Sequence, residues 1–432
     1  MHALHALPIF IDNRATRAKP HRRARTEESL RFEDAQRALQ QFLAPLTVDE
    51  FLDQTLAGGF CKIEGGETSP RIGLLGSDPQ AVLLEAFRLA PKLSFHSANP
   101  LGPPPSLEAI ADAGDFRQRI EQFHARNYSV RFPELRPLSP ALEYLARALE
   151  VLLHQPVTAS AFWSRGGMRA PVHCDDHDLI VVQLRGIKRW YVSSKPSELP
   201  NPWKGIPGDP PDLGPHATVD VRPGDLMYLP RGTLHSVDSD TESLHLSIGF
   251  TPLTVRDAVT AALYQLCELD QTLRATVGGR LAFQLLGVGF ERFVPPVVEA
   301  VERLRSACRT PGFLASAMQR RSARVIASLE ALPAVEATPP IDVDTVLTHT
   351  DAAFCHLSAN AEKIDFSYPG GHLYIHRGAE KDLLYMANTA TFRVRDVPGQ
   401  LTDEVRVALA TSLVQIGFLQ VVPAAAVAAR TR

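Results

Sequence analysis

The sequence predicts an α+β protein in which a small all-β barrel or sandwich lies between two helical regions. Apolar residues recur at helical spacing on both sides of the centre, as in SPALEYLARALEVLLHQ (139–155) and in the segments that follow Pro252. Between Val157 and Thr251, short β-rich runs alternate with Gly, Pro and Asp turns. Many short strands at regular spacing are typical of a sandwich or a small barrel.

Composition narrows the class of protein. The chain has 432 residues, 45% hydrophobic and 22% charged, which is ordinary for a soluble protein of two or three domains. The formal net charge of -3 argues against nucleic acid as a direct substrate. Five scattered cysteines without a CxxC pair favour the reducing cytoplasm. No apolar run reaches the roughly 18–20 residues of a membrane span, so we expect no membrane partner.

The first part of the chain divides into a tail and a helical approach to the barrel. Residues 1–35 hold a basic cluster, which predicts a disordered tail, although an acidic partner or RNA would also suit it. Residues 36–252 form the predicted barrel domain with its N-terminal helices. Thr47 and Glu50 predict a capping box, and Ser139 before a proline predicts another helix start.

Two further regions follow the barrel. Residues 253–335 are predicted to be helical, and their apolar stripes need a partner surface, which we expect to be a second copy of the chain or else the chain's own barrel. Residues 336–432 mix helices with strands around KIDFSYPGGHLYIH and TATFRVRDV, an order typical of a winged-helix-like module. The helix TDEVRVALATSLVQIG carries few basic residues, so we expect a structural or protein-contact role.

The segment PVHCDDHDLIVVQL (171–184) places titratable residues directly before a strand. His173 and Asp175 stand at i and i+2, a spacing that puts two side chains on one side of an extended chain. His235 follows a second unit, GDLMYLPRGTLHSV, made of a Gly-Asp turn, an apolar strand and a Pro-Arg-Gly turn. Two His and one carboxylate form the facial triad of non-haem Fe(II) oxygenases. A lone H-x-D is a weak signal, and the combination with the second unit and the β context strengthens it.

The segments HCDDHDLIVVQLRGIKRW, GDLMYLPRGTLHSV and SLHLSIGF resemble the JmjC/cupin oxygenases of the ribosomal-oxygenase type, which are Fe(II)- and 2-oxoglutarate-dependent protein hydroxylases. The resemblance implies a double-stranded β-helix (cupin, jelly-roll) core with flanking helices, a helical dimerisation region and a winged-helix-like C-terminal domain. His173, Asp175 and His235 match the metal ligands of that family. Lys188 matches the basic residue that binds the far carboxylate of 2-oxoglutarate, although taken alone it would be a solvated lysine.

Other positions of the resemblance are less specific. Ser164 falls where some members use a hydroxyl on the same carboxylate, but a core hydroxyl explains it equally well. His245 and Ser247 share one face of the last barrel strand and are expected to line the cosubstrate pocket, with a substrate contact or a satisfied core histidine as alternatives for His245. Ala161 departs from relatives that place a Tyr near this position. His177 is either a substrate contact or part of a salt bridge at the rim, and Asp178 is expected near the same rim.

The resemblance implies that the protein uses Fe(II), 2-oxoglutarate and O2 to hydroxylate an amino-acid side chain, with release of succinate and CO2. The expected substrate is a ribosomal or other basic protein, hydroxylated on Arg or His. Two alternatives stay open. One is hydroxylation of a small molecule or a biosynthetic peptide, and the other is a metal-binding cupin or interaction module without oxygenase activity.

Overall fold

The computed structural model describes residues 29–87, 92–108, 110–195, 211–276, 294–332, 340–351, 353–359 and 361–423. The chain forms two compact units. The barrel unit comprises Leu30–Pro252 with Thr350 and Asp351, and the C-terminal unit comprises the described residues from Leu253 to His349 and from Ala353 onward. Most of the predicted tail and the predicted boundary between 335 and 336 lie outside the described residues. Helix α1 (Ser29–Leu43) begins inside the range predicted as tail.

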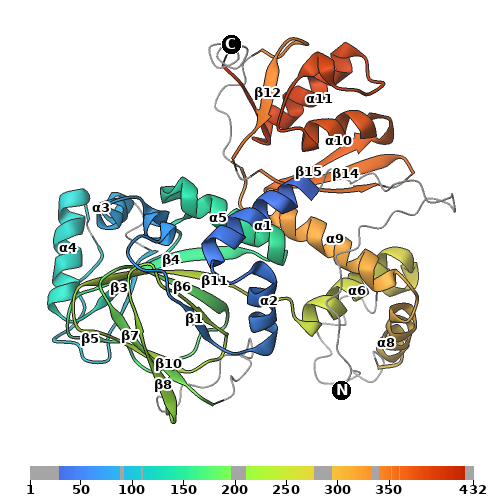
Figure 1. Ribbon diagram of the computed structural model, residues 1–432. Helices are drawn as coiled ribbons and strands as arrows, with labels where there is room; N and C mark the ends of the chain where they lie inside the picture. The colour runs from blue at the N-terminus through green and yellow to red at the C-terminus, as the bar shows by residue number, and fades with distance from the viewer. Residues whose placement is uncertain are drawn as a thin grey trace. The chain divides into compact units, whose positions relative to one another are not determined.

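The barrel unit contains two antiparallel sheets, and its α+β composition agrees with the predicted class (Figure 1). The larger sheet has the strand order β1-β9-β6-β11-β4-β3-β2, and the smaller has the order β5-β10-β7-β8. The strands are β1 Cys61–Ile63, β2 Ser94–His96, β3 Ser129–Phe132, β4 Val157–Ser164, β5 Met168–Arg169, β6 Asp178–Arg185, β7 Lys188–Ser193, β8 His216–Val221, β9 Leu226–Leu229, β10 His235–Ser239 and β11 Ser243–Phe250.

Strand β11 shows how the two faces of the larger sheet differ. It pairs with β4 on one side and β6 on the other, so it is buried on both edges. Leu246 and Ile248 belong to the apolar core that includes the helices, whereas His245 and Ser247 alternate onto the opposite, inner face. On that inner face Val181 of the larger sheet packs in one cluster with Trp190 of the smaller sheet. The inner faces of the two sheets therefore enclose the barrel interior.

Helices cover the outer face of the larger sheet. Thr47 and Glu50 form the predicted capping box of α2, and Ser139 caps α5 as predicted. Asp112 caps α4, which begins at Ala113. Ordinary N-cap chemistry fixes these starts, because each side-chain oxygen accepts a backbone N–H that has no helical partner. The remaining helices of this unit are α2 Val48–Ala57, η1 Pro70–Leu75, α3 Pro79–Glu85, α4 Ala113–Ala125, η3 Arg136–Leu138 and α5 Pro140–Leu153.

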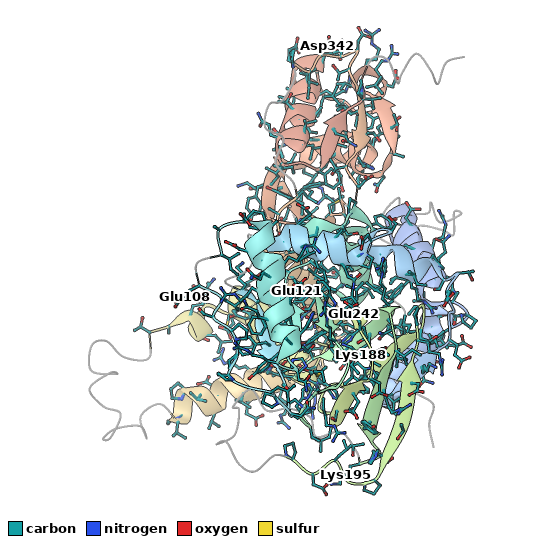
Figure 2. All side chains as sticks on the ribbon, turned by 90° about the vertical axis from the view of Figure 1, so that its left-hand side faces the viewer. Glu108, Glu121, Lys188, Lys195, Glu242 and Asp342 are labelled. Carbon is teal, nitrogen blue, oxygen red and sulfur yellow. The ribbon has the colours of Figure 1, made fainter. Side chains whose placement is uncertain are left out.

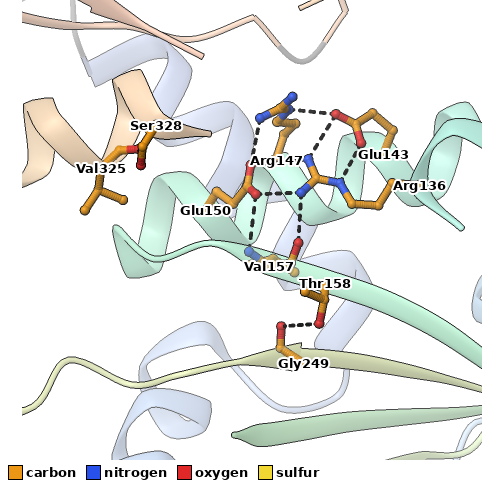
Figure 3. Close-up of polar contacts among 9 residues, drawn as sticks. All are labelled: Arg136, Glu143, Arg147, Glu150, Val157, Thr158, Gly249, Val325 and Ser328. Atoms are coloured by element: carbon orange, nitrogen blue, oxygen red, sulfur yellow. Dashed lines mark hydrogen bonds and ion pairs between the residues drawn. The ribbon is translucent and has the colours of Figure 1, made fainter. Parts of the chain in front are cut away.

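A buried network of charged side chains ties α5 to the barrel (Figure 3). Arg136 donates to Glu143 at 2.7 Å and to Glu150 at 2.6 Å, and Arg147 donates to the same two carboxylates. Arg136 also donates to the carbonyl of Val157, the first residue of β4, at 2.8 Å. Burial lowers the pKa of Arg136, but the hydrogen bonds that it donates to both carboxylates outweigh burial and raise that pKa above its ordinary value. Every charge in this network has an opposite charge beside it.

The C-terminal unit combines helices with two three-stranded sheets, β16-β12-β17 and β13-β14-β15. Phe366, Leu383 and Phe418 belong to its apolar core. His372 is half-buried in β15, with its Nδ1 2.9 Å from Oδ1 of Asp365. The elements are α6 Val255–Leu269, η4 Gln271–Arg274, α8 Val294–Cys308, α9 Phe313–Ser328, β12 Val346–His349, β13 His356–Ala359, β14 Lys363–Tyr368, β15 Gly371–His376, η6 Arg377–Ala379, α10 Glu380–Asn388, β16 Thr391–Arg393, η7 Val394–Asp396, α11 Asp403–Gln415 and β17 Leu419–Val421.

None of the described helices is both long and apolar enough to cross a membrane. The five cysteines of the chain, all of them described, are free thiols.

Candidate metal and cosubstrate site

The two histidines of the predicted triad are held together by the backbone. His173 and His235 form an antiparallel bridge, with N–H···O distances of 3.0 and 2.8 Å between their main chains. Asp175 lies in the loop between this bridge and β6, and its carbonyl accepts the Gly232 N–H at 2.8 Å. The sequence argument placed the H-x-D pair on one side of an extended chain, and the structure achieves this with a bridge rather than a continuous strand. The ligand atoms of the three residues all lie within 4.8 Å of one another.

Backbone carbonyls orient both imidazole rings. The Nδ1 atom of His173 lies 2.8 Å from the carbonyl oxygen of Pro171, and that of His235 lies 2.9 Å from the carbonyl oxygen of Thr233. Because a carbonyl only accepts, these contacts assign the proton to Nδ1 and leave the Nε2 lone pair as the possible ligand. Burial first, and then the charge of His173, lower the pKa of His235 to about 4. A neutral imidazole is the form that binds a metal ion.

This donor set fits a first-row divalent metal. Two imidazoles and one carboxylate, reaching one point from a bridge and an adjacent loop, match the 2-His-1-carboxylate arrangement that suits Fe(II). The Oδ2 atom of Asp175 lies 3.6 Å from Nε2 of His235, which is too long for a hydrogen bond between them. The described residues hold no other group of three such side chains at this spacing.

Lys188 is a buried cation on the inner face of the smaller sheet. It opens β7, as predicted, and only 1% of its surface is exposed. Figure 2 shows it among the barrel strands, whereas Lys195 lies at their periphery. Its Nζ donates to the carbonyl of Phe162 at 3.2 Å, and burial lowers its pKa to about 7. No carboxylate among the described residues forms an ion pair with it, so the interior is prepared for an anionic ligand.

Three other buried polar atoms inside the barrel lack hydrogen-bond partners among the described residues. They are Nδ1 of His245, Nε1 of Trp190 and Oε1 of Gln183. His245 and Gln183 are direct neighbours on β11 and β6, and the ring of Trp190 lies 5.5 Å from the rings of both His245 and His235. Such atoms are costly when buried without a partner. Together with Lys188 they fit a polar, negatively charged molecule such as 2-oxoglutarate beside the triad.

The remaining predicted site residues have different surroundings. His245 is buried and stacks on Phe162 with a 5.0 Å centroid distance. Its pKa is held well below the ordinary value by burial and then by the charge of Lys188. Ser247 lies on the same inner face, opposite Ser160 of β4. Ser164 instead bonds to the hydroxyl of Ser129 at 2.8 Å, which agrees with a core hydroxyl satisfied within the protein.

The structure also defines the surroundings of two residues next to the triad, Asp178 and His177. Asp178, expected near the barrel rim, is buried: it accepts from the Tyr228 hydroxyl at 2.6 Å and from the Arg231 N–H at 3.0 Å. It is therefore part of the structural frame of β6. His177 is partly exposed, with its Nδ1 2.8 Å from Oδ1 of Asp176, which is the rim pair that the sequence left open. Cys174 is exposed and is not among the clustered ligands.

Sequence reasoning missed the inner residues contributed by the short strands β2 and β3. His96 contacts the ring of Phe162 at 5.7 Å, and the guanidinium of Arg131 lies 6.0 Å from the centre of the same ring. Burial first, then the positive charges of Lys188, His173 and Arg131, lower the pKa of His96 to about 4. These strands have only three and four residues, too few for a periodic pattern. Only the pairing of β3 with β4, and of β2 with β3, reveals which side chains face inward.

The barrel region of the chain is similar in sequence to known proteins. The family pattern described as JmjC domain matches residues 139–258. Ribosomal oxygenase 2 of Rattus norvegicus is 25% identical over 175 residues, covering 38% of this chain and 37% of that protein. The Drosophila persimilis protein named bifunctional lysine-specific demethylase and histidyl-hydroxylase NO66 is 31% identical over 132 residues, covering 27% of this chain and 18% of that protein. The chain spans less than half the length of these curated relatives.

Solved structures extend the likeness of fold to most of the chain. The structure of YcfD, a ribosomal oxygenase from Escherichia coli, in complex with cobalt and 2-oxoglutarate is similar with a TM-score of 0.51 at 16% identity. The match covers 88% of this chain and 99% of that chain. At this identity the similarity shows a shared fold. The segment matched by the JmjC domain model, residues 139–258, contains the clustered triad.

Proposed function

We propose that this protein is an Fe(II)- and 2-oxoglutarate-dependent dioxygenase that hydroxylates an amino-acid side chain of a protein. One observation carries the proposal: a 2-His-1-carboxylate cluster and a buried, unpaired lysine face the interior of the same barrel. A bound iron would supply O2 activation, coupled to the oxidative decarboxylation of 2-oxoglutarate to succinate and CO2. The names and bound molecules of the relatives agree with this chemistry.

Each residue of the site has a role in this proposal. His173, Asp175 and His235 bind the metal, with their rings oriented by backbone carbonyls. Lys188 holds the far carboxylate of the cosubstrate, since a buried carboxylate needs a cation nearby. His245, with its unpartnered Nδ1, and Ser247 line the same pocket. The apolar cluster of the inner faces excludes water from the site.

The substrate is proposed to be a ribosomal or similar protein, because relatives of the barrel are named ribosomal oxygenase and histidyl-hydroxylase. A small molecule or a biosynthetic peptide is the second candidate, since the interior excludes neither. We place the reaction in the reducing cytoplasm, in keeping with five free thiols.

The C-terminal unit is proposed to be an assembly region. Helices α6 and α8 expose a set of apolar side chains that a monomer would leave in water, and α8 buries none of its described side chains. We infer that 253–335 forms a homodimer contact and that 336–432 is a winged-helix-like module. Equilibrium sedimentation checks the dimer. The exposed apolar residues of the two helices are Val255, Val259, Leu263, Tyr264, Leu269, Val294, Val297, Val298 and Val301.

The decisive experiment measures turnover and binding of 2-oxoglutarate by the full chain. With Fe(II) and ascorbate, the protein should convert 2-oxoglutarate to succinate, and single-oxygen additions should appear on proteins from incubated ribosomes by mass spectrometry. Lys188→Ala should raise the KM for 2-oxoglutarate by about 30-fold or more, as expected when a buried charge loses its partner. Arg189→Ala is the matched control, because Arg189 points outward and pairs with Asp220. Failure of the wild type both to bind and to turn over 2-oxoglutarate contradicts the proposal.

A further inference from the structure

The inner face of the barrel carries a second cation besides Lys188. It is the guanidinium of Arg131, which has no part in binding the metal or the cosubstrate in the proposed function. The strand register places His245, Phe162 and Arg131 in one row across β11, β4 and β3. The guanidinium lies over the Phe162 ring, 6.0 Å from its centre, and Nη2 donates to the Ser160 hydroxyl at 2.9 Å. Among the described residues, no carboxylate forms an ion pair with it. A guanidinium stays charged in a protein, so this positive charge is uncompensated.

His96 connects Arg131 with the triad. Its ring packs against the Phe162 ring at 5.7 Å, next to the guanidinium that lies over the same ring. The positive charges that help to lower its pKa come from Lys188, His173 and Arg131, after burial as the main cause. His96, Arg131 and Lys188 all contact Phe162, the first two at its ring and Lys188 at its carbonyl oxygen.

The excess charge can be counted for the site as the proposed function fills it, and this inference rests on that proposed function. A divalent metal, the Asp175 carboxylate, a dicarboxylate cosubstrate and a protonated Lys188 cancel one another. The charge of Arg131 then remains unbalanced. In a buried site an unbalanced charge recruits an acceptor or an anion from whatever binds next.

We propose that Arg131 selects the substrate: it binds an acceptor group of the substrate, a carbonyl or a carboxylate, and excludes a cationic target side chain. The hydroxylated residue is then a neutral or acidic one. Of the two protein targets implied by the family resemblance, His fits this site and Arg does not.

The exclusion follows from the partners that a guanidinium substrate requires. An arginine side chain is bound in proteins by carboxylates, often through two parallel hydrogen bonds. Among the described residues at the triad, the Asp175 carboxylate is committed to the proposed metal, and Oδ1 of the neighbouring Asp176 lies 2.8 Å from Nδ1 of His177. A guanidinium placed there would meet Arg131 and gain no counter-charge. A neutral imidazole has no such penalty, and the ring of Phe162 and the neutral ring of His96 offer surfaces against which it can pack.

The experiment measures peptide binding without turnover. The full chain is loaded with Mn(II) and N-oxalylglycine, a non-reacting analogue of 2-oxoglutarate. Fluorescent peptides have flanks randomised among neutral residues and His, Asn, Asp, Arg or Lys at the centre. Fluorescence anisotropy should show His-centred peptides binding at least about tenfold more tightly than Arg-centred peptides.

Variants of Arg131 test whether this residue causes the preference. Arg131→Gln should weaken binding of His-centred peptides and reduce the preference to below about threefold. Arg131→Glu should reverse it in favour of Arg-centred peptides, and Arg131→Lys, which keeps the charge, should retain it. Arg189→Gln is the matched control on the outer face and should leave the preference unchanged. Circular dichroism melting establishes that each variant is folded before it is compared.

The outcomes separate this inference from the proposed function. Equal or tighter binding of Arg-centred peptides by the wild type overturns the role of Arg131. An unchanged preference in both Arg131→Gln and Arg131→Glu overturns it as well, and so does an absence of binding by every peptide set. Loss of 2-oxoglutarate turnover in the wild type instead contradicts the oxygenase, and the peptide preference is still measured independently.

Discussion

Two groups of charges in the barrel unit, each with buried members, differ in how their charges are compensated. Beneath α5, two arginines and two glutamates pair with one another and with the backbone of β4 (Figure 3). Inside the barrel, Lys188 and Arg131 have no carboxylate partner among the described residues, and three buried polar atoms nearby have no hydrogen bond. The first group is closed and joins helix to sheet. The second group is open: its charges and polar atoms lack partners among the described residues, and a bound ligand can supply them.

The two groups affect the stability of the folded state differently. A buried charge without a partner destabilises the folded state, so it persists where a ligand supplies the partner. A closed network gains nothing from a ligand, and removing one member leaves the others uncompensated. Substitutions in the two groups should therefore have opposite effects on stability, and their effects on ligand binding should also differ.

The largest expected effect concerns the metal. His173→Ala removes one of three ligands that lie within 4.8 Å of one another. Metal affinity should fall by more than about 100-fold, because removing even a residue that only orients a ligand costs about 10–100-fold. Isothermal titration with Mn(II) in place of iron measures this loss. Cys174→Ala, at an exposed position between the ligands, is the control and should retain metal binding.

The next effect tests the contrast in stability directly. Glu150→Gln breaks the closed network and should lower the free energy of unfolding by about 3–5 kcal/mol, since it leaves Arg136 and Arg147 uncompensated. Lys188→Met removes an unpaired buried cation and should raise the stability of the ligand-free protein by about 1–4 kcal/mol. Denaturant unfolding of both variants measures the difference. If Lys188→Met is instead less stable than the wild type, Lys188 has a compensating partner in the ligand-free protein.

The pH dependence of cosubstrate binding should be moderate. Burial lowers the pKa of Lys188 to about 7 in the ligand-free protein, and a dicarboxylate binds the protonated form. Affinity for 2-oxoglutarate should therefore be constant below pH 7 and fall by up to about tenfold per pH unit above it. Calorimetric titration between pH 6 and 9 measures the slope. Lys188→Arg stays charged over this range, so its affinity should change much less with pH.

The smallest effect is expected at Ser164. Its hydroxyl bonds to Ser129 at 2.8 Å and so belongs to a closed pair. Ser164→Ala should cost about 1 kcal/mol of stability, as for a lost hydrogen bond, and change the KM for 2-oxoglutarate by less than about threefold. A much larger rise in KM, with stability retained, would place Ser164 in the open group beside Lys188.

The sequence predicted the ligands better than their surroundings. His173, Asp175 and His235 could be found because a residue spacing and a turn-strand-turn unit are local features. The inward position of Lys188 followed from its register after the RGI turn. His96 and Arg131 could not be found, since each lies on a strand whose inward face is defined by partners far away in the chain. Asp178 was misplaced for a similar reason: its contacts with Tyr228 and Arg231 join segments that the sequence does not bring together.

The sequence by itself determined the α+β class, the central run of strands, the capped helices and the identity of the triad, because periodicity, turn chemistry and capping act over a few residues. The tertiary structure alone decided which charges are compensated. Pairing is set by distances of a few ångströms between residues far apart in the chain, as between Arg136 and the backbone of β4. The charges beneath α5 are compensated by one another and those inside the barrel are not, and this difference makes the inner residues a proposed binding site.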